Sequence, residues 1–257
     1  MLEVPHGFVK GTVTDRIDWT ENEFSLMINA PVDPYFSGQF TKLALPDADG
    51  EWVRRAYSLV NYPHHKAGYE QMEFLFITAD EGELSPRLQQ LTAGDPVYVS
   101  KKSSGFMTLA EIPDNMTNLW LLSTGSAIGP FLSILDELET ASRFEEIVLV
   151  HAVRTEAELV YQSKIAQMVE RYQGKLRYIP IVSREESKGL LQGRIPDLLL
   201  SGVLAETAQV ALNKESSFFY ICGNPNMVKD TSAALNTLGY IKNLKRKAGN
   251  FSSENYW

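Results

Sequence analysis

The sequence contains few of the residues that build disulfides and metal sites. Among its 257 residues there are one cysteine and four histidines. One cysteine excludes an internal disulfide, which fits a reducing compartment. His64 and His65 lie in a polar stretch that reads as a loop, and His151 stands alone in an apolar strand. No cluster of Cys and His has metal-ligand spacing, so we predict no metal.

Long apolar runs are missing as well. No uninterrupted apolar segment is long enough to cross a bilayer, and residues 1–7 lack the cationic and apolar stretches of a signal peptide. The formal net charge is -8, which argues against nucleic acid or an anionic membrane as the main partner, because both require a dominant basic face. We expect a soluble cytoplasmic protein, and take it to be a monomer.

The amino-terminal part of the chain has the texture of an antiparallel β domain. Hydrophobic residues make up 44% of the sequence, enough for two cores. Short apolar and polar stretches alternate between prolines and glycines at a spacing typical of a small barrel or sandwich. Only residues 84–91 look helical. Strands are predicted over residues 8–19, 23–30, 52–60, 71–77 and 97–101.

After residue 112 the pattern of apolar residues changes. Continuous apolar runs at residues 119–122, 147–150, 177–182 and 218–221 are typical of strands buried on both faces. Helical stretches are predicted between them, over residues 131–139, 156–172 and 226–238. Alternating strands and helices predict a parallel sheet with ligands at the carboxyl ends of its strands. We therefore predict an antiparallel β-barrel over residues 1–112 and a parallel α/β domain over residues 113–257.

The segment Arg55-Ala56-Tyr57-Ser58 joins a cation, an aromatic ring and a hydroxyl at the end of a predicted strand. Arg55 can donate to a pyrophosphate, Tyr57 can lie against an isoalloxazine ring, and Ser58 can hydrogen-bond near its reactive nitrogen. These properties suit a flavin. Taken alone, the same residues also fit a cross-strand pair on a solvated face.

Two further segments follow apolar strands and contain glycine. Thr124-Gly125-Ser126 leads into a helix near Pro130, so its amides can face a pyrophosphate; an ordinary strand-helix turn is the alternative. Cys222-Gly223-Asn224-Pro225 opens the last helix, where glycine lets the backbone approach a ligand closely. A lone cysteine is otherwise most often a buried structural residue.

Three arginines, Arg154, Arg184 and Arg194, each follow a strand or turn of the second domain. Cations gathered where a parallel sheet binds its ligand are what a phosphate on the adenosine ribose needs, and no acidic residue stands in the role that the unphosphorylated form requires. NADP is therefore favoured over NAD. Any one of these arginines alone could equally be solvated.

Together with the terminal Glu254-Asn255-Tyr256-Trp257, these motifs resemble the ferredoxin-NADP reductase family, and the aromatic tail is similar to its bacterial ferredoxin/flavodoxin-NADP reductase branch. The resemblance spans nearly the whole chain. The first glycine loop departs from the family's commoner pattern, because Ser123 replaces a glycine and an Ile-Gly pair precedes Pro130.

The resemblance implies roles for particular residues. It implies that Cys222 lies beside the nicotinamide without acting as a nucleophile, and that Tyr256 covers the flavin ring and Trp257 the adenine. Catalytic roles are expected for Ser58, Tyr57, Cys222 and Glu254. FAD contacts are expected at Arg55, Ala56, Tyr57, Ser58, Glu73, Phe74, Leu84, Ser85, Ser126, Tyr256 and Trp257. NADP contacts are expected at Thr124, Gly125, Arg154, Ser183, Arg184, Arg194, Gly223, Asn224, Pro225 and Lys229.

The helix start at Gly82-Glu83-Leu84-Ser85-Pro86 also predicts Ser85 as the cap, with Pro86 in the first turn. By resemblance this helix would direct its amino terminus at the FAD pyrophosphate. Residues 103–106 are expected to border the FAD too.

The sequence thus indicates an FAD-dependent oxidoreductase that exchanges a hydride with NADPH at flavin N5 and passes single electrons to or from ferredoxin or flavodoxin. A reductase for another acceptor and a non-catalytic flavin-binding sensor are the alternatives. Lys242, Lys245, Arg246 and Lys247 precede the tail in an otherwise acidic chain. We expect them near the flavin, where they would steer an acidic carrier; a solvated helix face or loop is the other interpretation.

Overall fold

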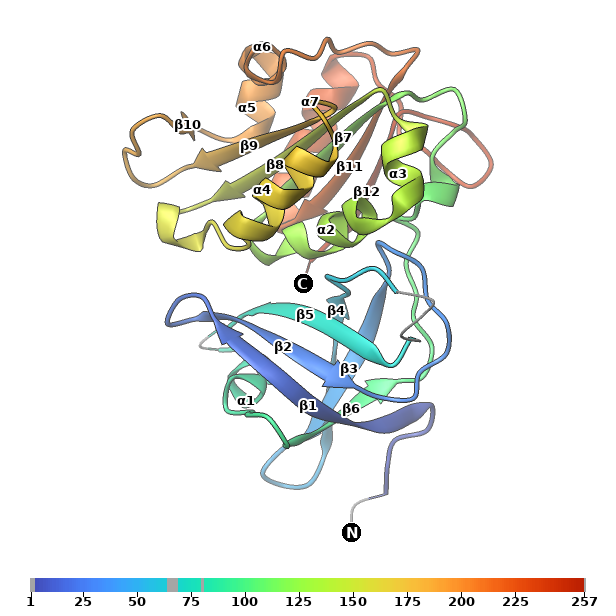
Figure 1. Ribbon diagram of the computed structural model, residues 1–257, viewed down its shortest axis with the longest axis vertical. Helices are drawn as coiled ribbons and strands as arrows, with labels where there is room; N and C mark the ends of the chain where they lie inside the picture. The colour runs from blue at the N-terminus through green and yellow to red at the C-terminus, as the bar shows by residue number, and fades with distance from the viewer. Residues whose placement is uncertain (1–2, 64–68, 80, 257) are drawn as a thin grey trace.

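The computed structural model describes residues 3–63, 69–79 and 81–256. Two domains are stacked along the long axis of the molecule, with the β domain below and the α/β domain above (Figure 1). The predicted boundary at residues 112 and 113 falls between the last strand of the β domain and the first strand of the α/β domain. Within the described residues, no helix is long and apolar enough to cross a membrane.

The β domain is a six-stranded antiparallel sheet in the order β4-β3-β6-β1-β2-β5. Its two edges approach each other, because Leu59 and Phe74 form a bridge and the amide of Val60 donates to the carbonyl of Glu73 at 2.9 Å. The sheet therefore curls into a barrel around a core that includes Phe74. Its elements are β1 (Phe8–Asp18), β2 (Glu23–Asn29), β3 (Phe40–Pro46), β4 (Trp52–Ser58), β5 (Gln71–Ile77), α1 (Ser85–Gln89) and β6 (Pro96–Ser100).

The α/β domain contains a six-stranded parallel sheet in the order β10-β9-β8-β7-β11-β12. Its strands are β7 (Asn118–Thr124), β8 (Glu146–Val153), β9 (Leu176–Val182), β10 (Leu191–Gln192), β11 (Ser217–Gly223) and β12 (Phe251–Asn255). Its α-helices are α2 (Gly129–Asp136), α3 (Leu138–Arg143), α4 (Gln162–Arg171), α5 (Ile195–Leu200), α6 (Val203–Ala208) and α7 (Pro225–Thr237). Three short 3-10 helices lie at Leu109–Glu111, Gly125–Ile128 and Glu156–Glu158.

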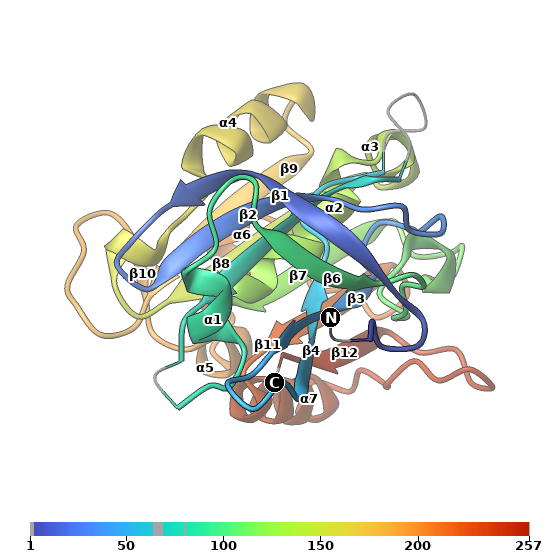
Figure 2. The same ribbon diagram turned by 90° about the horizontal axis from the view of Figure 1, so that it is seen from below.

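Helices cover both faces of this sheet. Side chains of α2 and α4 pack on one face, and those of α5, α6 and α7 on the other. Viewed along the long axis, α4 and α7 lie on opposite sides of the molecule (Figure 2). Because both faces are covered, β7, β8 and β11 are almost entirely buried, which explains their continuous apolar sequences. The predicted fold class, a β-barrel followed by a parallel α/β domain, is confirmed.

Several elements differ from the prediction. The predicted helix over 131–139 is divided at Glu137, whose backbone is extended, and the one over 156–172 is divided before α4 by Tyr161, at φ 60°. The strands β3, β10 and β12 and the helices α5 and α6 were not predicted. β10 has only two residues and β12 exists because it pairs with β11, a contact between distant segments that no local pattern reveals.

Candidate functional site

The predicted nucleotide-binding segments meet at one edge of the parallel sheet. Thr124 ends β7 and Gly223 ends β11, and these strands are neighbours in register, with Cys222 opposite Ser123. On the other side of β7, Ser123 is opposite His151 of β8. The carboxyl ends of parallel strands lie at one edge of the sheet, so distant segments of the chain form one continuous rim there.

Two backbone loops of this rim are tied together. The amide of Asn224 donates to Oγ1 of Thr124 at 3.1 Å, while Oδ1 of Asn224 accepts from the amide of Asn226 at 2.9 Å and caps α7. Gly223 has φ +148°, and a Cβ there would overlap Oγ1 of Thr124. Glycine is thus required at this position because Thr124 approaches it closely, and the predicted close approach to a ligand stays a prediction.

The loop after β7 reaches the barrel. Gly125 has φ +54°, and a Cβ there would lie 3.2 Å from Cδ1 of Ile77 in β5. Nε2 of His151 donates to the carbonyl of Gly125 at 3.2 Å. Burial lowers the pKa of His151 to about 4, so the imidazole ring is neutral. Its hydrogen bond to Gly125 therefore fixes the loop after β7 without adding charge. Ser126, the next residue, is buried.

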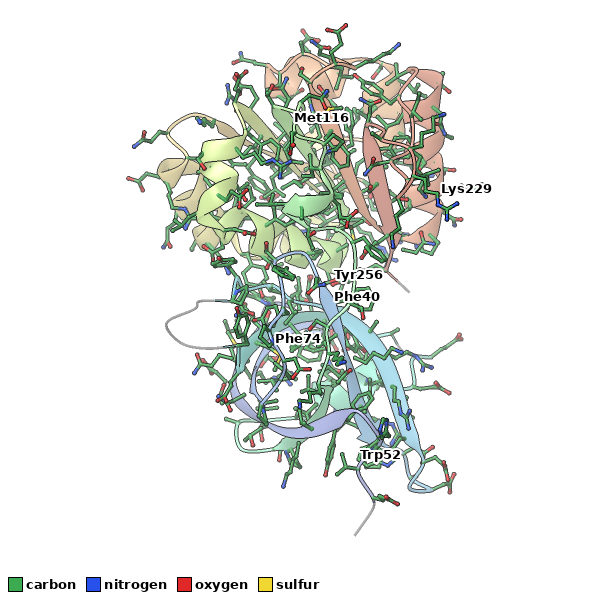
Figure 3. The ribbon with its side chains drawn as sticks, turned by 90° about the vertical axis from the view of Figure 1, so that its right-hand side faces the viewer. Phe40, Trp52, Phe74, Met116, Lys229 and Tyr256 are labelled. Atoms are coloured by element: carbon green, nitrogen blue, oxygen red, sulfur yellow. The ribbon has the colours of Figure 1, made fainter. Side chains whose placement is uncertain are left out.

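The three predicted arginines are at the same edge, further along the sheet. Arg154 follows β8, Arg184 lies two residues after β9, and Arg194 lies two residues after β10. The amide of Arg184 donates to the carbonyl of Arg154 at 2.9 Å, so these two are adjacent. All three and Ser183 are exposed, and no carboxylate partner for their guanidinium groups is present among the described residues. Lys229 projects from α7 on the outer surface (Figure 3).

The flavin segment forms the end of β4. Arg55 is exposed and forms an ion pair with Glu83, next to α1, while its Nη1 donates to the carbonyl of Arg54 at 2.8 Å. Tyr57 is half-buried, with its ring 4.8 Å from that of Phe76 in an edge-on contact. Burial raises the pKa of Tyr57 to about 12, so its hydroxyl stays neutral. The structure thus has a forked donor and a flat ring on one strand.

The carboxyl-terminal tail joins the two halves of the site. The amide of Tyr256 donates to the carbonyl of Gly223 at 2.9 Å, which continues the pairing of β12 with β11. Tyr256 lies at the junction of the two domains (Figure 3). Its hydroxyl hydrogen-bonds with Ser58, so the side chain reaches the end of β4. Burial raises the pKa of this hydroxyl, and the hydrogen bond opposes that rise. Trp257 lies outside the described residues.

Cys222 and Glu254 are opposite each other on β11 and β12. Burial, followed by the charge of Glu254, raises the pKa of the Cys222 thiol well above its ordinary value, so the thiol is protonated. Burial also raises the pKa of Glu254, whose Oε1 accepts from the amide of Phe106 at 3.1 Å. A protonated thiol is a poor nucleophile, in keeping with the role that the resemblance implies.

Some of the residues predicted to contact FAD make other contacts within the protein. Ser85 is not the cap of α1: Leu84 holds that position without a side-chain hydrogen bond, and Oγ of Ser85 accepts from the amide of Ala79 at 3.1 Å. The side chain of Phe74 is fully buried in the barrel core (Figure 3), and its backbone pairs with Leu26 and Leu59. The carboxylate of Glu73 accepts from a tyrosine of the other domain, a contact that no local sequence signal indicates.

The basic segment is not beside the tail's tyrosine. Leu244 and Lys247 exchange backbone hydrogen bonds at 2.9 and 2.8 Å in a tight exposed turn that precedes β12. β12 then runs from Phe251 to Asn255, and Tyr256 follows at its far end. With about 3.3 Å per residue, at least about 13 Å separates the two. The turn is therefore not adjacent to Tyr256, and the expectation that it lies near the flavin stays a prediction.

Comparison with known proteins agrees with this geometry. Residues 121–233 match the family described as "Oxidoreductase NAD-binding domain". The chain is 47% identical over 251 residues to proteins named "Flavodoxin/ferredoxin--NADP reductase" in Shigella flexneri and Escherichia coli, covering 97% of this chain and 99% of either relative. A crystal structure of a ferredoxin NADP+ reductase from Neisseria gonorrhoeae with bound FAD and NADP superposes with a TM-score of 0.88 at 30% identity, covering 98% of this chain and 99% of that one. The chain belongs to the family of flavodoxin/ferredoxin-NADP reductases.

Proposed function

We propose that this protein is an FAD-dependent oxidoreductase that exchanges a hydride with NADPH and transfers single electrons to or from ferredoxin or flavodoxin. The observation that carries the proposal is the position of Tyr256. Its backbone is bonded to Gly223 of the nucleotide edge, and its side chain reaches Ser58 of the flavin segment. Tyr256 therefore contacts both predicted cofactor sites at the junction of the two domains.

The side chains at the domain junction have the chemistry that FAD binding requires. Tyr57 offers a flat, half-buried ring, and Arg55 offers a guanidinium whose exposed ion pair with Glu83 is weak enough for a pyrophosphate to replace it. When bound, FAD supplies the hydride and one-electron chemistry. Ser58 would hydrogen-bond at the ring edge, and Tyr256 would cover the ring face and exclude water.

On the nucleotide side, the chain's own groups bind and orient. The close approach of Gly223 to Thr124 holds the two loops together at the rim where the dinucleotide would bind. Arg154 and Arg184, with Arg194 from the next loop, would bind the 2'-phosphate of NADPH. Cys222, protonated and uncharged, and Glu254 would lie beside the nicotinamide and hold it in reactive alignment.

The names of the relatives in Shigella flexneri and Escherichia coli include flavodoxin and ferredoxin, and we propose these two carriers as partners of this protein. A reductase for another acceptor remains the second candidate, and kinetics with different acceptors separate the two. A monomeric state and a cytoplasmic location stay predictions. The fully buried free Cys222 fits a reducing compartment.

A single preparation tests the function. The purified protein should be yellow, denaturation should release FAD because the predicted motifs contain no residue suited to a covalent flavin link, and NADPH added without oxygen should bleach the colour. The bleached protein should then reduce a ferredoxin or flavodoxin. Release of FMN alone, or protein that neither contains flavin nor takes up FAD, would refute the proposal.

A further inference from the structure

Tyr161 holds an unusual backbone conformation between the two domains. It occupies the position before α4, with φ 60° and ψ 21°, in the left-handed region. For a bulky residue this conformation is unfavourable and persists only where surrounding contacts impose it. Its side chain is 5% exposed, so those contacts are made by its ring and hydroxyl.

The hydroxyl of Tyr161 is bound entirely by the barrel. It donates to Oε1 of Glu73 in β5 at 2.6 Å and lies 2.7 Å from Oγ of Ser25 in β2. Nε1 of Trp19 donates to the same Oγ at 2.8 Å, and the indole ring lies 4.7 Å from the phenol ring. Lys164, one turn into α4, lies 3.8 Å from Oε2 of Glu73. A chain of hydrogen bonds thus crosses the domain junction through one side chain.

The same loop connects this anchor to the predicted phosphate site. Oε2 of Glu158 accepts from the amide of Arg154 at 3.0 Å, and Oε1 accepts from Oγ1 of Thr155. The segment from Arg154 to Tyr161 is therefore short and internally bonded. Its first residue is one of the predicted NADP ligands, and its last residue is fixed to the FAD barrel.

We propose that Tyr161 is a positioning residue that sets the orientation of the α/β domain on the barrel, so that a nucleotide held at the arginines meets the flavin in reactive geometry. The inference rests on the proposed function. Hydride transfer is sensitive to such placement, because a displacement of about 1 Å at the reacting atoms can reduce a rate about a hundredfold. Tyr161 itself touches neither substrate nor cofactor in this scheme.

Tyr172 provides a matched control at the other end of α4. Its hydroxyl is also buried and donates at 2.7 Å, but to the carbonyl of Leu135 within the same domain. Tyr161→Phe and Tyr172→Phe each remove one buried tyrosine hydroxyl from the ends of one helix. Only the first removes a bond between the domains.

The experiment compares the two variants in three measurements. Tyr161→Phe should slow anaerobic reduction of the bound flavin by NADPH at saturation by at least about tenfold, while the Kd for 2',5'-ADP, which binds the α/β domain alone, stays within about twofold. Small-angle scattering should show a broader distribution of distances for Tyr161→Phe than for the unmodified protein. Tyr172→Phe should match the unmodified protein in all three.

Two results of the hydride-transfer measurement overturn the inference. One is hydride transfer at the unmodified rate in Tyr161→Phe, and the other is equal loss in both variants, which would indicate general destabilisation. The scattering comparison does not need turnover. Unmodified protein that fails to oxidise NADPH would therefore refute the proposed function, whereas indistinguishable scattering from both variants would refute the role of Tyr161.

A double-mutant cycle adds a check on the contact itself. Ser25→Ala removes the hydroxyl that joins Trp19 and Tyr161. If the two hydroxyls act through each other, the effects of Ser25→Ala and Tyr161→Phe on hydride transfer are not additive. Strict additivity would contradict a shared interdomain connection.

Discussion

The amide of Asn224 and Oγ1 of Thr124 are 3.1 Å apart, and this hydrogen bond joins two loops one hundred positions apart in the sequence. It brings Gly223 so close to Thr124 that no side chain fits between them. The proposed pyrophosphate site and the proposed nicotinamide site are therefore one continuous backbone surface. We expect any group inserted there to separate the loops and to displace both halves of a bound nucleotide.

Gly223→Ala tests this arrangement. Because the added methyl would overlap Oγ1 of Thr124, we expect a loss of about 1 to 3 kcal/mol in the free energy of unfolding and at least about tenfold weaker NADP binding. Denaturant unfolding and nucleotide titration measure the two effects. Gly94→Ala is the control, since Gly94 also has positive φ (+98°) but open space around it. Equal nucleotide affinity in both variants would contradict the role of the loop contact.

Arg184→Ala should raise the KM for NADPH about tenfold and leave that for NADH nearly unchanged, because one charge-assisted contact to the 2'-phosphate is lost. Steady-state kinetics with both nucleotides provide the measurement. Arg177→Ala is the control: Arg177 lies at the start of the same strand, β9, and pairs with Glu146 at 2.7 Å. Equal catalytic efficiency of the unmodified protein with NADPH and NADH would exclude the phosphate role.

Removal of Tyr256 and Trp257 should leave a folded, yellow protein with tighter nicotinamide binding and altered FAD retention, because a side chain covering the flavin no longer has to be displaced. Tyr256→Ala should reproduce the tighter binding, whereas Tyr256→Phe, which keeps the ring, should not. The visible spectrum and NADPH kinetics report both effects. Unchanged spectra and kinetics after truncation would make the tail purely structural.

Glu23 should make stability depend on pH. Its side chain is buried, neither oxygen has a hydrogen-bond partner among the described residues, and burial, followed by the charge of Glu158, raises its pKa from 4.5 to about 8. Between these values the folded protein keeps a proton that the unfolded chain releases, so the free energy of unfolding falls as pH rises and levels off above about pH 8.

Glu23→Gln should remove that fall. The pKa difference of about 3.5 (8 minus 4.5) corresponds to at most about 5 kcal/mol, so near pH 9 the variant should be the more stable by up to this amount, with little difference near pH 4. Denaturant unfolding at both values is the measurement. Glu21→Gln changes an exposed carboxylate of the same turn and should leave the pH dependence as it is. A parallel profile for Glu23→Gln would show that Glu23 is ionised in the fold.

Reversing Lys245 and Arg246 to glutamate should change carrier reduction less than about twofold at physiological salt. The turn is separated from Tyr256 by the length of β12, about 13 Å, which exceeds the screening length of about 8 Å. At low salt a slower carrier reaction is expected, with ferricyanide reduction unaffected. A large deficit that persists at high salt would mean that a carrier docks directly on this turn.

The sequence alone determined the class of the fold and the main motifs. Strands buried on both faces require continuous apolar residues, and β7, β8 and β11 have them. The parallel sheet could therefore be predicted from the sequence. The sequence placed Gly125 and Gly223 directly after apolar strands, and the structure puts both at the carboxyl edge of the sheet, with Gly223 against Thr124. A resemblance carried by four short motifs was enough to name the family.

Only the tertiary structure decided which distant segments meet, within the α/β domain and across the two domains. β12 pairs with β11, Tyr161 is bound by Ser25 and Glu73, and the basic turn lies a strand away from Tyr256. β12 is far from β11 in the sequence, and Tyr161 is far from Ser25 and Glu73, whereas local patterns of hydrophobicity and turn residues depend only on neighbours along the chain. Contacts between domains are fixed by packing of complementary surfaces, and that packing exists only once both domains have folded.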